Sequence, residues 1–168
     1  MLQAARTLVV VFAAFAFAGR TALAETASLV PPPGWSAQEL AVRVRGGVEA
    51  LGYWSGAKSE NAPQTLILLK VPHAGSLEEW SKAHLADVLK NEPTVIVDED
   101  VPASVCGKKL RAHHLRFRDT VDDNLMAIEQ YAVKGADDFI YYVTYTRLER
   151  QPAVAAARQA MTGLCLHA

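Results

Sequence analysis

Residues 65–71 read TLILLKV, and five of these seven residues are aliphatic. A strand with one face in water alternates between apolar and polar residues, whereas a strand covered on both faces is apolar almost throughout. The stretch therefore predicts a central strand of a sheet that has other structure packed above and below it.

Two segments on the C-terminal side of this strand carry helix signals. Ser76 and Glu79 occupy the two positions of a capping box, and the apolar residues that follow have helical spacing as far as Pro93. Gln151-Pro152 starts a second predicted helix, because proline is favoured early in a helix. Five residues fall on one face of that helix and are expected to look inward: Val154, Ala157, Met161, Leu164 and Cys165.

Other segments favour strands, chiefly by alternation of apolar and polar residues. The predicted strands are Gln38–Arg45, Val48–Trp54, Thr94–Val101, Leu110–Arg118, Asn124–Lys134 and Asp138–Arg147. Ser55–Pro63 is predicted to be a polar loop, and short turns at 119–123 and 135–137 make the strands that they join antiparallel. Residues 38–168 are therefore expected to form a single α+β domain, with a mainly antiparallel sheet of about six or seven strands covered by helices.

Residues 1–24 have the composition of an export leader. A positively charged start is followed by an apolar run of 12 residues at Thr7–Ala18, and the small residues of Ala22-Leu23-Ala24 precede Glu25. This order predicts a signal peptide that is cleaved between Ala24 and Glu25. The run is shorter than the roughly 20 residues of a membrane-spanning helix, although an uncleaved anchor is the alternative. The expected location is periplasmic or secreted, with no membrane span after cleavage.

Cleavage would leave 15 basic and 18 acidic residues, a net charge of −3. Nucleic-acid binding is not expected, because no basic excess is present to hold a polyanion. Residues 25–37 contain three successive prolines at 31–33, which favour an extended chain. They are predicted to form an extended proline-rich arm in front of the domain, with a proline-recognition ligand as the alternative.

Cys106 and Cys165 are the only cysteines, and they are 59 residues apart. In an exported protein a single pair favours an intramolecular disulfide bond. Closing a loop of this size stabilises the fold by about 4 kcal/mol in the chain-entropy model. A reactive thiol pair and a metal site are the alternatives, and neither is accompanied by a CxxC spacing. The bond is expected to fasten the last helix to the sheet.

No motif predicts a catalytic residue, a metal ligand or a cofactor site. HExxH, GxSxG and glycine-rich phosphate loops are all absent from the sequence. The adjacent His113 and His114 would point to opposite faces of a strand, and His84 is expected at the edge of the core. The acidic run Asp98–Asp100 lacks the ligand spacing of a calcium loop and is interpreted as a solvated strand end.

Tyr53 and Trp54 stand near a predicted strand end, beside the predicted polar loop. Aromatic residues next to loops are common in binding surfaces. These two residues are therefore the candidate binding surface, and ordinary core packing is the alternative.

Four landmarks lie along residues 25–168. They are Pro33-Gly34-Trp35, the helix start SLEEW at Ser76–Trp80, the strand YYVTYTR at Tyr141–Arg147, and an alanine-rich closing helix that ends in Leu164-Cys165. Together they resemble the Mog1/PsbP-like domains, especially the small exported bacterial members of unknown function. The resemblance implies an antiparallel sheet sandwiched between helices. It also implies a protein that binds or assists other proteins, and it brings no catalytic motif.

These observations favour an exported, non-enzymatic module of the cell envelope that binds or helps to assemble another envelope protein, or binds a small ligand. The rival hypothesis is a periplasmic enzyme, such as a hydrolase, whose active-site residues are dispersed along the chain. A pocket with converging polar groups would favour the enzyme, and an exposed apolar patch would favour the binding module.

Overall fold

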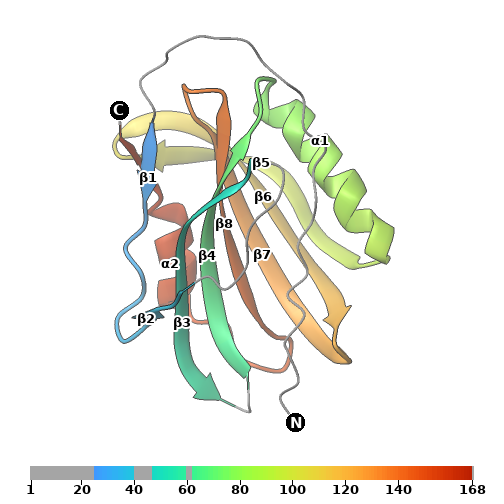
Figure 1. Ribbon diagram of the computed structural model, residues 1–168. Coiled ribbons are helices and arrows are strands. Elements are labelled where there is room, and N and C mark those ends of the chain that lie inside the picture. Colours follow the sequence, from blue (N-terminus) through green and yellow to red (C-terminus); the bar gives the residue numbers. More distant parts are fainter. Residues whose placement is uncertain (1–24, 40–46, 60–61, 168) are drawn as a thin grey trace.

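The computed structural model describes residues 25–39, 47–59 and 62–167, and Figure 1 shows its α+β architecture. The elements are β1 (Thr26–Ser28), β2 (Ser36–Ala37), β3 (Glu49–Ser59), β4 (Ala62–Pro72), α1 (Leu77–Val88), the 3-10 helix η1 (Leu89–Asn91), β5 (Thr94–Val105), β6 (Lys108–Val121), β7 (Asn124–Lys134), β8 (Phe139–Leu148), α2 (Ala155–Thr162) and β9 (Cys165–His167).

Seven strands form one antiparallel sheet in the order β2-β3-β4-β8-β7-β6-β5. The predicted fold class is thereby confirmed. The TLILLKV stretch lies in β4, between β3 and β8, as expected for a central strand. Leu66 and Leu68 are buried on one face, whereas Val71 is buried in a cluster on the other.

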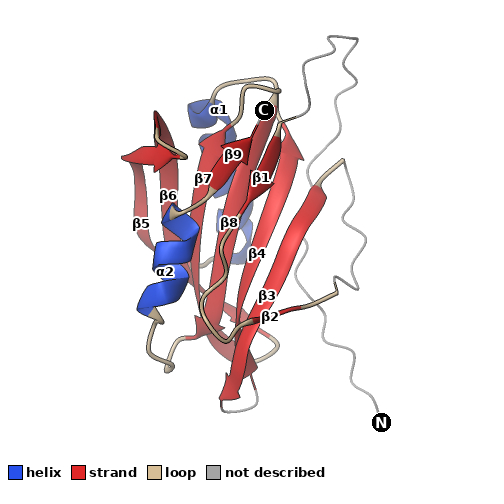
Figure 2. Cartoon of the chain, turned by 90° about the vertical axis from the view of Figure 1, so that its left-hand side faces the viewer, coloured by secondary structure: helices blue, strands red, loops and turns tan. Residues whose placement is uncertain are grey.

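The two helices cover opposite faces of the sheet (Figure 2). Helix α1 begins with the predicted capping box: the Ser76 hydroxyl accepts from the Glu79 backbone N–H, and the Glu79 carboxylate accepts from the Ser76 N–H. Trp80 and Val88 are the apolar side chains that it buries most deeply. Helix α2 places Ala157 and Met161 against the other face, where β1 and β9 form an additional two-stranded ribbon.

The hairpin of β3 and β4 is longer than the sequence indicated. The polar loop predicted over Ser55–Pro63 is wrong, because β3 continues to Ser59 and β4 begins at Ala62. Ladder hydrogen bonds satisfy the backbone at the end of a hairpin whatever the side chains are, so polar composition does not end a strand there. The strand predicted over Gln38–Arg45 falls mostly outside the described residues.

The C-terminal helix is shorter than predicted. Helix α2 ends at Thr162, and Cys165 lies in β9, so its predicted place on the last helical turn is wrong. Strand β9 pairs antiparallel with β1, with Ala27 opposite Leu166. The helical spacing that extends as far as Cys165 is therefore overridden by pairing with a segment that lies far away in the sequence.

Candidate functional site

A buried polar network lies where the described chain begins. We call Glu25, Lys70, Asp137 and Tyr141 the N-terminal network. Lys70 of β4 and Asp137 of the β7–β8 turn form an ion pair of 3.0 Å, and their side chains are only 9% and 4% exposed. The Tyr141 hydroxyl lies 2.7 Å from Asp137 Oδ2 and 2.6 Å from the Glu25 carbonyl oxygen. The network therefore joins Glu25 to two strands, β4 and β8, and to the turn between β7 and β8.

Glu25 contributes both its backbone and its side chain to this network. Its backbone nitrogen donates to Asp137 Oδ2 at 3.1 Å, and its carbonyl oxygen accepts from Lys70 Nζ at 2.9 Å. Its carboxylate accepts from the Ala136 backbone N–H at 2.8 Å. Glu25 is consequently buried, with 6% of its surface exposed.

The electrostatics of the N-terminal network keep Asp137 ionised and Tyr141 neutral. Burial alone would raise the pKa of Asp137, but the hydrogen bond from Tyr141 and the hydrogen bond and charge of Lys70 outweigh it, so the pKa is lowered. Burial and the Asp137 carboxylate raise the pKa of Tyr141. The Tyr141 hydroxyl therefore stays protonated and remains a hydrogen-bond donor. The network is suited to stabilising the fold rather than to proton transfer near neutral pH.

His113 of β6 lies between two carboxylates of β5. Its Nε2 is 3.2 Å from Asp98 Oδ1, and its Nδ1 is 3.1 Å from Asp100 Oδ1. The acidic run is solvated, as interpreted, but its predicted place at a strand end is wrong. Antiparallel pairing of β5 with β6 places Glu99 and Asp100 opposite His114 and His113 in the middle of the strand.

His114 points to the opposite face, as predicted. Its Nε2 is 3.1 Å from Glu129 Oε1 of β7, and its Nδ1 is 3.6 Å from Glu99 Oε1 of β5. Glu129 Oε2 also accepts from Arg158 Nε of α2 at 2.8 Å. Burial would raise the pKa of Glu129, but hydrogen bonds from His114 and Arg158 lower it overall. We call the two histidines and their four carboxylates the histidine ladder.

His84 of α1 is a buried histidine, 2% exposed, as predicted for the edge of the core. Its ring stacks on Trp80 with centroids 4.7 Å apart, and its Nε2 lies 2.7 Å from Gln130 Oε1. Burial lowers the pKa of His84. The neutral imidazole is therefore the form that the fold accommodates.

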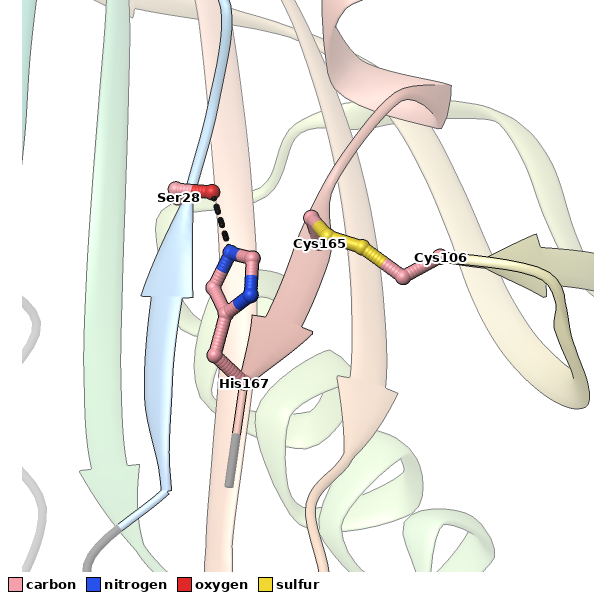
Figure 3. The surroundings of a disulfide bond; sticks show 4 residues. All are labelled: Ser28, Cys106, Cys165 and His167. Carbon is pink, nitrogen blue, oxygen red and sulfur yellow. Dashed lines mark hydrogen bonds between the residues drawn. A yellow bond between two sulfur atoms is a disulfide. The ribbon is translucent and has the colours of Figure 1, made fainter.

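Cys106 and Cys165 form a disulfide bond with their Cα atoms 5.1 Å apart (Figure 3). The bond ties the β5–β6 turn to β9, not to the end of α2 as expected. His167 follows in β9, and its Nε2 lies 2.8 Å from Ser28 Oγ of β1. Within the described ranges, the two cysteines and His167 are the group whose ligand atoms could hold a metal ion. Since thiolates are the metal ligands, the closed disulfide and such a metal site exclude one another.

The two residues of the candidate binding surface lie on β3, where consecutive side chains point to opposite faces. Trp54 packs against the core cluster that contains Leu66 and Tyr145. Its ring covers Gly52 so closely that a Cβ atom there would clash. Tyr53 is half-buried on the other face. Tyr53 and Trp54 therefore do not share one face.

The sequence reasoning missed the N-terminal network and the pairing within the histidine ladder. A lysine inside the TLILLKV run was a signal for the first, because a charge in a central strand needs a buried partner. The spacing of Asp98, Asp100 and His113 was a signal for the second only once the strand register was known.

Comparison with known proteins identifies a fold relative. No family model matches the sequence, and no curated protein sequence matches it. The structure is similar to the crystal structure of LpqN from Mycobacterium tuberculosis, described as involved in cell envelope biogenesis. The TM-score is 0.56, the identity is 16%, and the match covers 86% of this chain and 85% of that chain. At this identity the similarity shows a shared fold.

The described helices offer no candidate for crossing a bilayer. Neither α1 nor α2 has the length and apolar character that a spanning helix requires.

Proposed function

We propose that this chain is an exported, non-enzymatic module of the cell envelope that binds or helps to assemble another envelope protein. The observation that carries the proposal is the fold shared with LpqN, a protein described as involved in cell envelope biogenesis. The predicted leader and the Cys106–Cys165 disulfide support it, because disulfides persist in oxidising compartments outside the cytoplasm.

The chemistry of the polar clusters also favours a binding module. Both ring nitrogens of His113 and of His114 lie near carboxylates, and Lys70 is paired with Asp137. A histidine that acts as a general base needs a ring nitrogen that can reach a proton of the substrate, whereas these ring nitrogens face carboxylates of the protein itself. Side chains engaged with one another in this way stiffen a sheet, and a rigid sheet suits surface recognition.

Tyr53 is the proposed point of contact. It lies in β3, whose outer neighbour in the sheet is the two-residue strand β2, and its side chain is half-buried. Trp54, in contrast, is held by core packing, so its part in the proposal is to fix the strand that presents Tyr53. Tyrosine supplies a large, amphipathic contact area, which is why it is enriched in binding hot spots.

Site-specific photocrosslinking in living cells tests this proposal. A photoreactive residue at Tyr53 should give a discrete adduct with an envelope protein. The same residue at Lys108, which is exposed on β6, the second strand from the opposite edge of the sheet, is the matched control and should give none. Equal adducts at both positions, or none at Tyr53, would contradict the proposed contact.

The second candidate function is a periplasmic hydrolase with a dispersed active site. It is favoured by one observation, the contact of His114 with Glu129, since a carboxylate that orients an imidazole is a common feature of general bases. Ester and amide substrates offered to the purified protein test this candidate. Turnover that His114→Gln abolishes would support the enzyme, and the absence of turnover across the panel would oppose it.

A further inference from the structure

The N-terminal network lacks one positive charge. Three charged side chains make up the N-terminal network, namely the carboxylates of Glu25 and Asp137 and the ammonium group of Lys70. Each of these residues is less than 9% exposed. Lys134 and the exposed Glu49 act on the network from outside with opposite charges. The enclosed side chains alone therefore sum to −1, which is costly where water is excluded.

Asp137 also has an unused acceptor. Its Oδ2 receives hydrogen bonds from Glu25 N, Lys70 Nζ and Tyr141, whereas its Oδ1 is buried and has no hydrogen-bond partner. A buried acceptor without a donor costs about 1–3 kcal/mol. An additional donor near the Glu25 nitrogen would remove this cost as well as the excess charge.

We propose that the N-terminal network binds the new N-terminus that removal of the predicted signal peptide creates. Hydrolysis of the Ala24–Glu25 peptide bond by a signal peptidase consumes one water molecule, which leaves a carboxylate on Ala24 and an amine on Glu25. The amine takes up a proton and becomes an α-ammonium group on the nitrogen that lies 3.1 Å from Asp137 Oδ2. This group supplies both the missing charge and the donors for Oδ1.

The fold makes the processed terminus part of the core. Strand β1 follows Glu25 immediately and pairs with β9, which the disulfide ties to the β5–β6 turn. Gly135 leaves room for the group, because a Cβ atom there would lie 2.7 Å from both Asp137 Oδ1 and Glu25 Oε2. Cleavage thus completes a buried ion pair at one end of the ribbon formed by β1 and β9. The disulfide bond anchors the other end of that ribbon.

Trace acylation of the exported protein tests the proposal, after mass spectrometry has verified that its chain begins at Glu25. An unperturbed α-amine has a pKa near 8 and reacts well below the pH at which lysines do. In the native protein the Glu25 amine should react at least about tenfold more slowly than in the denatured chain, the effect of one pKa unit. Equal rates in the two states would overturn the proposal.

Two matched variants identify the partner of the amine. Asp137→Asn should restore rapid acylation of the Glu25 amine, whereas Asp138→Asn, at the exposed neighbouring acid, should leave it protected. Protection that persists in folded Asp137→Asn would overturn the assignment to Asp137.

A chain extended by one serine before Glu25 provides a test that does not depend on the folding of Asp137→Asn. The extension leaves every side chain in place but moves the charge away from the network. Its thermal midpoint should fall by at least about 3 °C, and the effect should exceed that of the same extension at the C-terminus. An unchanged midpoint would overturn the proposal.

Discussion

The N-terminal network and the histidine ladder are built from the same chemistry in different surroundings. Both pair carboxylates with basic side chains that other segments of the chain contribute. In the network the pair of Lys70 and Asp137 is almost wholly enclosed, whereas in the ladder the side chains of Glu99, Asp98 and Asp100 are 58%, 39% and 33% exposed. Enclosed pairs are strongly destabilised when one partner is lost, because the other charge stays buried, while exposed pairs contribute little. Burial therefore predicts that the network contributes more to the stability of the fold than the ladder does.

Removal of the Lys70 charge should have the largest effect. Lys70→Met keeps the length of the side chain but removes the enclosed ammonium group that pairs with Asp137, which should cost about 3–5 kcal/mol of unfolding free energy. Urea denaturation measures it. The matched control is Lys82→Met, whose pair with Glu78 lies on the surface of α1 and should leave the midpoint unchanged. A loss of the same size in both variants would break the comparison.

Loss of the disulfide bond should have the second-largest effect on stability. Replacement of Cys106 and Cys165 by serine should cost about 2–5 kcal/mol, the usual range for a native bridge in a small secreted domain. Because the bond ends in β9, amide exchange should accelerate first in β9 and in its partner β1, next to the N-terminal network. Ready labelling of both thiols in the native, unreduced protein would show that the bond is absent.

Mild acid should act through His84. Its pKa is lowered in the folded protein, so the unfolded chain takes up a proton more readily. Stability should therefore fall as the pH drops below about 6.5, the ordinary pKa of histidine. Thermal midpoints measured between pH 5 and pH 7.5 should vary less in His84→Gln than in the native protein. His167→Gln, at an exposed histidine, should keep the native slope.

A charge removed from the histidine ladder should matter less than one removed from the network. Glu129→Gln keeps the shape of the side chain but weakens its contacts with His114 and Arg158, and the partly exposed partners should limit the loss to about 1 kcal/mol. Urea denaturation beside Lys70→Met gives the direct comparison. A loss equal to that of Lys70→Met would show that exposure does not separate the two clusters.

Chelation should have no effect on the native protein. EDTA is expected to leave the thermal midpoint unchanged, because the disulfide occupies the two sulfur ligands of the Cys106, Cys165 and His167 group. A fall in the midpoint that one added metal reverses would reveal a site that the sequence and the geometry do not indicate.

Features that depend on residues close together in the sequence could be predicted from the sequence. The apolar TLILLKV run gave a strand covered on both faces, and Ser76 with Glu79 gave the start of α1, because burial of a strand and capping of a helix are encoded within a few positions. The alternation in 124–134 likewise matched β7 at both ends. The pairing of the two cysteines also followed from their number and the predicted export.

Contacts between residues that lie far apart in the sequence depend on the folded arrangement of the strands. Register on β5 and β6 brought Asp98 and Asp100 to His113, and pairing with β1 turned Cys165 from a helical residue into a strand residue. Lys70 contacts Asp137 and the Glu25 backbone, which lie 67 and 45 positions away from it in the sequence. Local sequence patterns do not contain this information. The register of a strand pair depends on which whole face of the strand is buried and on the cost of closing long loops, and both depend on the complete fold.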